Sequence, residues 1–236
     1  MKTLSIIKTG TTYPEIQAAH GDFDNWFAEA LKHQGLTLEV VDVTKEAPLP
    51  LQTDGILVTG SPAMVSDRAP WSDCTAAWLA DQVASGRPVL GVCYGHQLLA
   101  HALGGRADYH PQGREIGTLS IQLSDEGRRD PLLGPLPPVF PAHLTHLQSA
   151  VELPPGAMLL ARSGHEPHQA FRFGNQAWGV QFHPEFTAPI MHAYIDRLAP
   201  ALADEGRSVG TIRDGIQETL QARAILHRFA ERVAAG

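Results

Sequence analysis

Cysteine is scarce in this sequence. Of 236 residues only Cys74 and Cys93 carry a thiol. Two cysteines cannot supply the disulfide framework that stabilises many small secreted proteins, and free thiols are typical of a reducing compartment. We therefore expect a cytoplasmic protein whose stability comes from a buried hydrophobic core.

Long apolar runs and clusters of positive charge are also missing. The first apolar stretch is short and ends at Lys8, and no other segment is long enough to cross a membrane. The sequence has 18 Lys and Arg residues and 25 Asp and Glu residues, which gives a formal net charge of -7, and it contains no basic run that compensates locally. This charge argues against binding to nucleic acid or to an anionic membrane. A small-molecule substrate fits better.

The usual signatures of cofactor sites are absent as well. Neither Gly-x-Gly-x-x-Gly nor a Walker lysine loop follows any expected strand, so we expect no nucleotide cofactor. Histidine is plentiful, and a metal hydrolase is an alternative, because two pairs of histidines are three residues apart. The pairs are His143 with His146 and His165 with His168, beside Glu166. They lie in loop or strand contexts rather than on one helix face, so we expect no metal.

Short apolar runs alternate with amphipathic helical patterns in the first hundred residues. This alternation indicates βαβ units and a parallel sheet. The expected strands are Leu4–Lys8, Leu38–Val43, Gly55–Thr59 and Pro88–Val92, and the expected helices are Phe23–Gln34 and Trp71–Ser85. Pro48-Leu49-Pro50 and Gly60-Ser61-Pro62 are expected loops, the latter at a strand's carboxyl end, where open α/β sheets bind ligands. Cys74 shares a helical face with Trp71 and Trp78, so we expect it in the core without a chemical role.

Beyond Gly105 the pattern changes. Strand-like segments follow one another without intervening helices, which indicates antiparallel pairing. The expected strands are Thr118–Leu123, Met158–Ser163, His168–Phe173 and Ala177–Phe182, followed by helices Ile190–Ala199 and Thr211–Val233. The proline-rich segment Pro131–Pro141 is expected to be an irregular connection. We predict a single domain over residues 1–236, with a catalytic core of about 4–200 and a helical extension of about 201–236.

The segment Pro88–Leu99 favours a reactive cysteine. An apolar strand runs into Cys93 and a helical pattern follows at once, with Gly91 and Gly95 on either side. Such glycines leave room for the sharp turn of a nucleophile elbow. A helix N-terminus also favours the thiolate, through its unpaired N–H groups and the helix dipole. The alternative is a small buried core residue, which is common for free cysteine.

A cysteine hydrolase also needs an imidazole held in one orientation by a third group. Residues 178–182 form a strand-like run that delivers His183 to a sheet end, and Pro184 then turns the chain so that Glu185 can lie beside the imidazole. Taken alone, this tripeptide is more often a turn than a catalytic pair. Beside the cysteine elbow, the catalytic interpretation is the better one.

Gly91–Gly95 and Gly179–Glu185 together resemble the two motifs of the class I glutamine amidotransferase family, in the same order and over residues 4–185. The resemblance implies an α/β fold, a flavodoxin-like three-layer sandwich with a mainly parallel central sheet, extra antiparallel strands and C-terminal helices. It implies that Cys93 attacks the γ-amide of glutamine to form a thioester, that His183 is the general base and acid, and that Glu185 orients it.

Further positions match the family less strictly. Gly60-Ser61-Pro62 stands where the family has Gly-Gly-Pro, so the resemblance implies an oxyanion hole built from the backbone of Gly60, Ser61 and Tyr94. Gln97 matches a glutamine that helps hold substrate. Thr145–Gln148, with His146 as a substrate-binding candidate, stands where enzymes of the GMP synthetase type carry Ser-His-x-Asp, and Gln148 replaces the acid.

The fate of the ammonia is left open by these residues. The chain carries no ATP-binding signature, so the resemblance implies either a synthetase partner subunit that uses the ammonia or a stand-alone hydrolase of γ-glutamyl compounds. A binding protein that keeps the fold without turnover is the alternative outside the enzymes.

Overall fold

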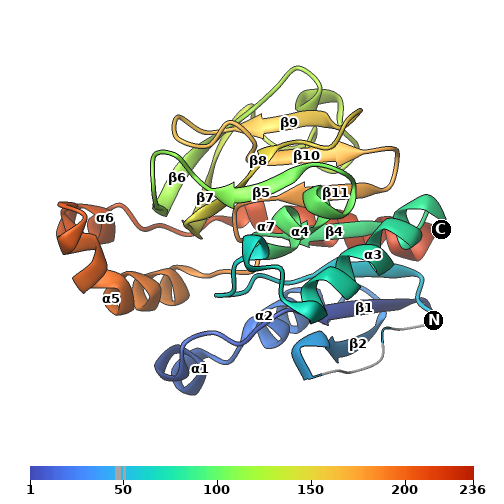
Figure 1. Cartoon of the computed structure of the whole chain (residues 1–236), viewed down its shortest axis with the longest axis horizontal. Helices are drawn as coiled ribbons and strands as arrows, with labels where there is room; N and C mark the ends of the chain where they lie inside the picture. The colour runs from blue at the N-terminus through green and yellow to red at the C-terminus, as the bar shows by residue number, and fades with distance from the viewer. Residues whose placement is uncertain (46–48, 50–51) are drawn as a thin grey trace.

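The computed structural model describes residues 1–45, 49 and 52–236. Its main feature is a nine-stranded sheet, with a separate two-stranded sheet beside it (Figure 1). In spatial order the large sheet contains β2 (Thr37–Asp42), β1 (Thr3–Lys8), β3 (Gly55–Val58), β4 (Val89–Val92), β11 (Ala177–Val180), β10 (Ala170–Phe173), β9 (Met158–Arg162), β6 (Glu115–Leu123) and β7 (Val139–His146). The pairs from β2 to β11 are parallel and the pairs from β11 to β7 are antiparallel. The small sheet pairs β5 (Arg106–Tyr109) with β8 (Gln148–Glu152).

Helices cover both faces of the parallel half, because its strands are apolar on both faces. Leu57 and Leu90 pack into one core cluster with α2 (Phe23–Leu31) and α7 (Leu220–Ala235). Their neighbours Ile56 and Val89 pack into another with α3 (Pro70–Ala84) and α4 (Tyr94–Ala102). Strands buried on both faces are typical of parallel sheets between helix layers. The predicted three-layer α/β fold with extra antiparallel strands is confirmed.

A third cluster joins helices at the carboxyl end of the parallel strands. It contains Ile16 of α1 (Pro14–His20), Trp26 of α2, and Ile195 and Leu202 of α5 (Ala188–Asp204). The short α6 (Val209–Asp214) follows α5, and the 3₁₀ turns are η1 (Val43–Lys45), η2 (Val65–Asp67) and η3 (Gly127–Arg129). In Figure 1, α1, α5 and α6 extend away from the sheet on one side of the molecule.

Most expected elements occur within a few residues of their predicted bounds, but several predictions were wrong. The helix expected over Thr211–Val233 is two helices, α6 and α7, because Gly215 ends the first of them. The irregular connection expected over Pro131–Pro141 stops earlier, since Val139–Pro141 already belong to β7. Four elements were not predicted: α1, β5 and β8, which are short and lack a clear period, and β7, which begins within the proline-rich segment. The loop expected over Pro48-Leu49-Pro50 lies largely outside the described residues.

The buried face of α3 also differs from the prediction. Ser72, Ala76 and Leu79 are buried, whereas Cys74 is exposed. This buried face meets α4, where the Ser72 and Tyr94 hydroxyls are 2.6 Å apart. Trp71 and Trp78 are half-buried and pack against the core as expected, so the prediction was wrong for Cys74.

The C-terminal segment packs into the main core. Six residues of α7 are buried, among them Phe229 and Val233, and they belong to the same cluster as β1, β3 and β4. A Cβ at Gly55 would lie 2.4 Å from Val233, so this end of β3 and α7 are in close contact. The helix is thus a layer of the sandwich rather than an appendage.

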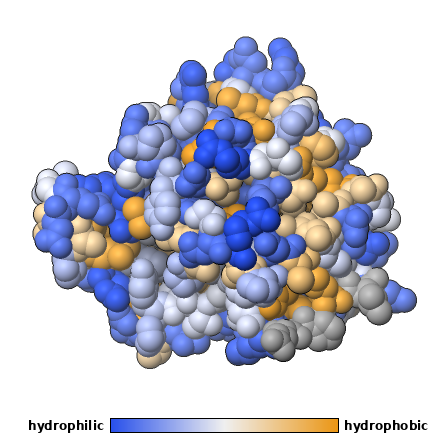
Figure 2. Space-filling model, viewed as in Figure 1, coloured by the Kyte–Doolittle hydropathy of each residue, from blue (hydrophilic) through white to orange (hydrophobic). Residues whose placement is uncertain are grey.

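The surface carries scattered apolar side chains. In Figure 2 polar residues cover much of the visible face, with apolar groups gathered mainly toward its right-hand side. The large apolar residues with high exposure come from different elements: Met1, Val40, Tyr109, Val139, Met158 and Leu220. Single exposed residues of this kind are ordinary. Within the described ranges, no helix has the length and apolar character needed to cross a membrane.

Candidate active site

Three neighbouring strands end side by side at the edge that carries the expected site residues. The order β3, β4, β11 is parallel throughout, with Val58 paired to Gly91 and Val92 paired to Val180. The Cys93 N–H donates to the Val180 carbonyl at 2.9 Å, so the first residue after β4 is tied to the end of β11. The loop after β3, the cysteine after β4 and the histidine after β11 are therefore brought together by the sheet.

Cys93 lies in a strained turn. It has φ 51° and ψ -102°, and in the described part of the chain only Arg68 shares a positive φ among non-glycine residues. Such a conformation costs about 1–3 kcal/mol and is common at functional sites. The two flanking glycines are needed for space, since a Cβ would lie 2.3 Å from the Gly95 carbonyl at Gly91 and 2.4 Å from the Val58 carbonyl at Gly95. The local chain has the form of a nucleophile elbow.

His183 and Glu185 form a buried pair beside this elbow. His183 Nδ1 and Glu185 Oε1 are 2.8 Å apart, and the two side chains are 2% and 0% exposed. The turn at Pro184 that places them is closed by the Phe186 N–H donating to the His183 carbonyl. His183 Nε2 is buried and has no hydrogen-bond partner among the described residues. The ring nitrogen opposite the carboxylate is therefore available for proton transfer.

Two aromatic rings lie beside the imidazole. Phe186 stacks on His183 with centroids 4.1 Å apart, and Phe23 at the start of α2 is stacked with centroids 6.3 Å apart. The start of α2 is held by Asp22, whose carboxylate accepts from the Phe23 N–H within a capping box with Asn25. These contacts limit rotation of the ring.

The charge on His183 follows from its partners. Burial disfavours the imidazolium, but the neighbouring negative charge of Glu185, with a contribution from Cys93, outweighs it and raises the pKa of His183 to about 10. The pair is thus an imidazolium held against a carboxylate at neutral pH. Such a group can donate a proton to a leaving amine.

The loop after β3 accommodates serine in place of the family's second glycine. Ser61 is not among the described residues with positive φ, so its backbone needs no glycine. Gly10 makes room for its side chain, since a Cβ there would lie 2.3 Å from Ser61 Oγ. Gly60 must stay small, because a Cβ would lie 2.9 Å from His183 Cε1. Tyr94 opens α4, and its N–H has no carbonyl to bond within the helix.

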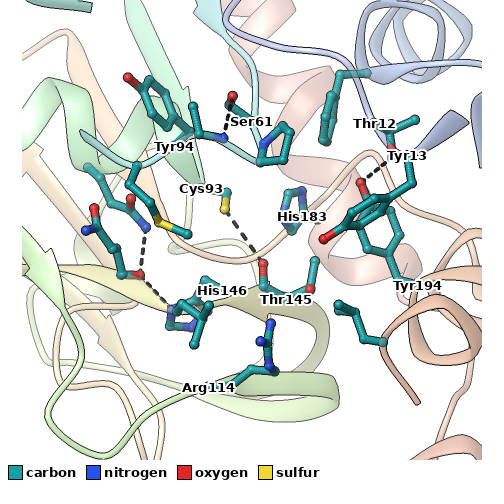
Figure 3. Close-up of a pocket in the computed structure, with 18 residues that line it drawn as sticks. Thr12, Tyr13, Ser61, Cys93, Tyr94, Arg114, Thr145, His146, His183 and Tyr194 are labelled. Atoms are coloured by element: carbon teal, nitrogen blue, oxygen red, sulfur yellow. Dashed lines mark hydrogen bonds between the residues drawn. The ribbon is translucent and has the colours of Figure 1, made fainter. Parts of the chain in front are cut away.

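A cavity of about 140 Å³ surrounds Cys93 (Figure 3). Figure 3 places Ser61 and Tyr94 on one side of the sulfur, Thr145 and His146 on the other, and His183, Tyr13 and Tyr194 on a third. The Cys93 Sγ is 4.0 Å from the Thr145 carbonyl. The cavity is lined by residues from several regions of the chain: Thr12, Tyr13, Phe23, Ser61–Met64, Cys93, Tyr94, Gln97, Arg114, Thr145–Gln148, His183, Tyr194 and Leu198.

Gln97 and His146 line this cavity but are bonded elsewhere. Gln97 Nε2 donates to the Gln148 carbonyl at 2.7 Å and to Gln181 Oε1 at 3.0 Å, which leaves its oxygen without a bond to a described residue. His146 uses both ring nitrogens, at 2.9 Å from the Gln148 carbonyl and 2.8 Å from Glu115 Oε2. The expectation that the His146 ring contacts substrate is therefore not favoured by the geometry. Its two hydrogen bonds instead link Glu115 of β6 to Gln148 of β8, next to Thr145.

The other histidines of the metal alternative are dispersed. His143 Nδ1 is 3.1 Å from Thr118 Oγ1, His165 Nε2 is 3.1 Å from the Gly113 carbonyl, and His168 Nδ1 is 2.7 Å from the Ala150 carbonyl. Over residues 1–45, 49 and 52–236, no group of three or more His, Cys, Asp or Glu side chains is arranged to hold a metal ion.

Several residues of the site were missed from the sequence. Arg114, Tyr13 and Tyr194 reach the cavity from two loops and a helix far from the two motifs, whereas Thr145 belongs to the segment already compared with Ser-His-x-Asp. The aromatic residue after His-Pro-Glu, Phe186, carried a weak signal, because it immediately follows the catalytic candidates. The others had no local pattern that distinguished them from ordinary loop or helix residues.

Comparison with known proteins agrees with this geometry. The family model described as glutamine amidotransferase class-I matches residues 17–197. One subunit of the glutamine-hydrolyzing GMP synthase of Natronomonas pharaonis is 34% identical, over 70% of this chain and 84% of that protein. The GMP synthase of Thermosipho melanesiensis is 29% identical over 84% of this chain, which spans only 36% of that protein. A glutamine amidotransferase structure from Thermotoga maritima has a TM-score of 0.80 at 19% identity, covering 100% of both chains, which is a likeness of fold.

The family model covers most of the chain, and the elbow at Cys93 and the His183–Glu185 pair both fall within its range. The resemblance found from these two motifs is confirmed. The chain belongs to the class I glutamine amidotransferase family.

Proposed function

We propose that this protein hydrolyses the γ-amide of glutamine through a thioester on Cys93 and releases ammonia for an acceptor. The observation that carries the proposal is the placement of Cys93 and His183 at the ends of adjacent parallel strands, with Glu185 bonded to the imidazole in a nearly closed environment. Membership of the family supports the same chemistry.

In the first half of the reaction the Cys93 sulfur attacks the amide carbon of glutamine. A C–S bond forms and the carbonyl electron pair moves to oxygen, where the N–H groups of Ser61 and Tyr94 donate to it, with Gly60 leaving space for His183. His183 then gives a proton to the nitrogen, the C–N bond breaks, and ammonia leaves. The product is a γ-glutamyl thioester.

In the second half water replaces ammonia. His183 takes a proton from the water as its oxygen attacks the thioester carbon, the C–S bond breaks, and glutamate and free Cys93 result. Glu185 holds Nδ1 and stabilises the imidazolium without reacting. Gln97 contributes its side-chain oxygen to the bound donor.

A synthetase partner is the proposed user of the ammonia. The Natronomonas relative is named as one subunit of a GMP synthase, and the match to this chain spans 84% of it, which supports a two-subunit arrangement. Gln148, which stands in place of an acid, has its side chain bonded to Ser66. The segment that carries Gln148 is thus held to η2 by a neutral contact. The cytoplasm, predicted from two free cysteines, is the proposed compartment.

A stand-alone γ-glutamyl hydrolase is the second candidate, and one feature of the cavity favours it. On the His183 side, from which the amine departs, Figure 3 places the aromatic rings of Tyr13 and Tyr194 rather than charged groups. Aromatic and aliphatic walls can pack against an amine larger than ammonia. Since the thioester is the same for every γ-glutamyl donor, a change of leaving amine needs no change in the triad.

The deciding experiment treats the purified chain with a glutamine-analogue electrophile and, separately, with glutamine and γ-glutamyl peptides. We expect mass spectrometry to find the label on Cys93 and not on Cys74, and ammonia or amine release to be measurable without a partner. An unlabelled Cys93 under conditions that label a known amidotransferase would contradict the proposal. If Cys93 is labelled but no donor turns over until cell extract is added, the partner-dependent enzyme is favoured over the stand-alone hydrolase.

The pH dependence of turnover should depend on Glu185. The folded-state pKa of His183, raised to about 10, means that its imidazolium is kept at neutral pH and lost as the pH rises toward 10. By linkage, the stability from this pair is fully present below the unfolded histidine pKa of about 6.5 and is lost as the pH rises through about 10. For Glu185→Gln we expect the alkaline limb of kcat to move to lower pH, with a loss of about 10- to 100-fold at pH 8. An unchanged limb would show that Glu185 does not set this pKa.

A further inference from the structure

Arg114 is the one Lys or Arg side chain among the described residues that line the cavity, and no Asp or Glu of the described part lines it. It immediately precedes β6, in a chain whose net charge is -7. Figure 3 places Arg114 beyond Thr145, across the cavity from Ser61 and Tyr94. A cationic group therefore borders a cavity that is otherwise walled by neutral residues and histidines.

The guanidinium of Arg114 is held in place. Its Nε donates to Glu205 Oε1 at 3.0 Å, at the end of α5, and its side chain is only 12% exposed. The Arg207 guanidinium donates to the Arg114 carbonyl at 2.9 Å, which fixes the backbone as well. With Nε occupied by Glu205, the two Nη groups form no hydrogen bond to a described residue. The two Nη groups are therefore free donors on a largely buried guanidinium whose position is fixed.

A planar pair of N–H donors matches the two oxygens of a carboxylate. We propose that Arg114 binds a carboxylate of the donor substrate and thereby determines specificity for anionic donors. This inference rests on the proposed hydrolysis at Cys93. Arg114 does not touch the reacting atoms, so it acts on binding and not on the chemical step.

Two carboxylates of a γ-glutamyl donor can fill this position. One is the α-carboxylate of the glutamyl group, which every donor including glutamine carries. The other is a carboxylate on the leaving amine, which only γ-glutamyl amino acids carry. Both have the same chemistry, and donors that lack one or the other distinguish them.

The test compares Arg114→Gln and Arg114→Lys with the wild type on four donors. These are glutamine, 4-aminobutanamide (which lacks the α-carboxylate), γ-glutamyl methylamide and γ-glutamylglycine. Arg129→Gln is the matched control, since Arg129 is an exposed arginine on η3 with a similar single carboxylate contact. Glu205→Gln keeps the guanidinium and removes its anchor.

We expect Arg114→Gln to raise KM about 10- to 100-fold for the donors whose carboxylate it binds, with kcat nearly unchanged. Losses on all donors except 4-aminobutanamide identify the α-carboxylate, and losses on γ-glutamylglycine alone identify the leaving group. Arg114→Lys should recover part of the loss, and Glu205→Gln should show a smaller rise in KM with the same donor pattern. Equal losses on all four donors, or none, would overturn the proposal.

Binding to an inactive variant separates this proposal from the proposed function. Glutamine and γ-glutamylglycine are titrated calorimetrically into Cys93→Ser with and without Arg114→Gln. If no donor turns over in the wild type but binding weakens about 10-fold or more on loss of Arg114, the hydrolase proposal fails and the carboxylate site stands. If turnover is normal and binding is unaffected, the carboxylate site fails alone.

Discussion

Replacing Cys93 with alanine is expected to reduce kcat/KM for the best donor by at least about 1,000-fold, to the level of the background. The thioester needs a sulfur at this position, and the described cavity residues offer no second thiol. The neighbouring Ser61 Oγ already accepts from the Ala63 N–H in its own loop. Steady-state ammonia or amine release, with circular dichroism to verify folding, measures the effect. Activity above a few per cent of wild type would remove Cys93 from its role.

Two further variants sharpen this test. Cys74→Ala should leave turnover unchanged, because Cys74 is exposed on α3 and outside the cavity. Cys93→Gly should be as inactive as Cys93→Ala but melt at a higher temperature, since glycine relieves a φ of 51°. For a chain of this size, each kcal/mol of relieved strain corresponds to about 2–4 °C. A lower melting temperature for the glycine variant would argue against strain at the elbow.

His183→Ala is expected to lower kcat by about 1,000-fold, nearly as much as loss of the cysteine. Both proton transfers pass through Nε2, and the buried Nδ1 contact with Glu185 at 2.8 Å leaves that nitrogen as the free one. The substitution also leaves Glu185, which is 0% exposed, without its partner, so a fall in melting temperature accompanies it. Single-turnover acylation separates the chemical loss from the loss of stability.

The comparison between His183 and Glu185 tests the division of roles. Glu185→Gln keeps a hydrogen-bond acceptor at the same place, so its effect should be at least about tenfold milder than that of His183→Ala. His227→Gln serves as the control, because that ring bonds the Ala30 carbonyl away from the cavity. Equal losses for His183→Ala and Glu185→Gln would mean that the carboxylate does more than orient the ring.

Parallel strands with strong apolar character were predictable because their signal is a short run of consecutive apolar residues. The runs that became β3 and β4 are buried throughout and contain only apolar residues and glycine, so their pattern needs no knowledge of neighbours. Elements that depend on a partner were not predictable. Pro141 reads as a break, yet it lies within β7 opposite Ser120 of β6, because β7 is an edge strand of the large sheet, where proline is tolerated.

In helix α3 the sequence pattern alone did not predict correctly which residues are buried. Its apolar residues suggested that Trp71, Cys74 and Trp78 face the core. The two tryptophans do pack against it, but Cys74 is exposed and Ser72 is buried, with its hydroxyl against that of Tyr94. Composition of a helix face is therefore a weak guide when the neighbouring helix offers a polar partner.

The sequence by itself determined the chemistry expected of this protein. Two glycines beside Cys93 and the consecutive residues His183, Pro184 and Glu185 are short-range signals, because a strained elbow and a histidine–carboxylate turn are built from neighbours in the chain. Only the tertiary structure decided what surrounds the sulfur. Arg114, Tyr13 and Tyr194 enter the cavity through the sheet order and the packing of α1 and α5, and these long-range contacts leave no period or motif in the sequence.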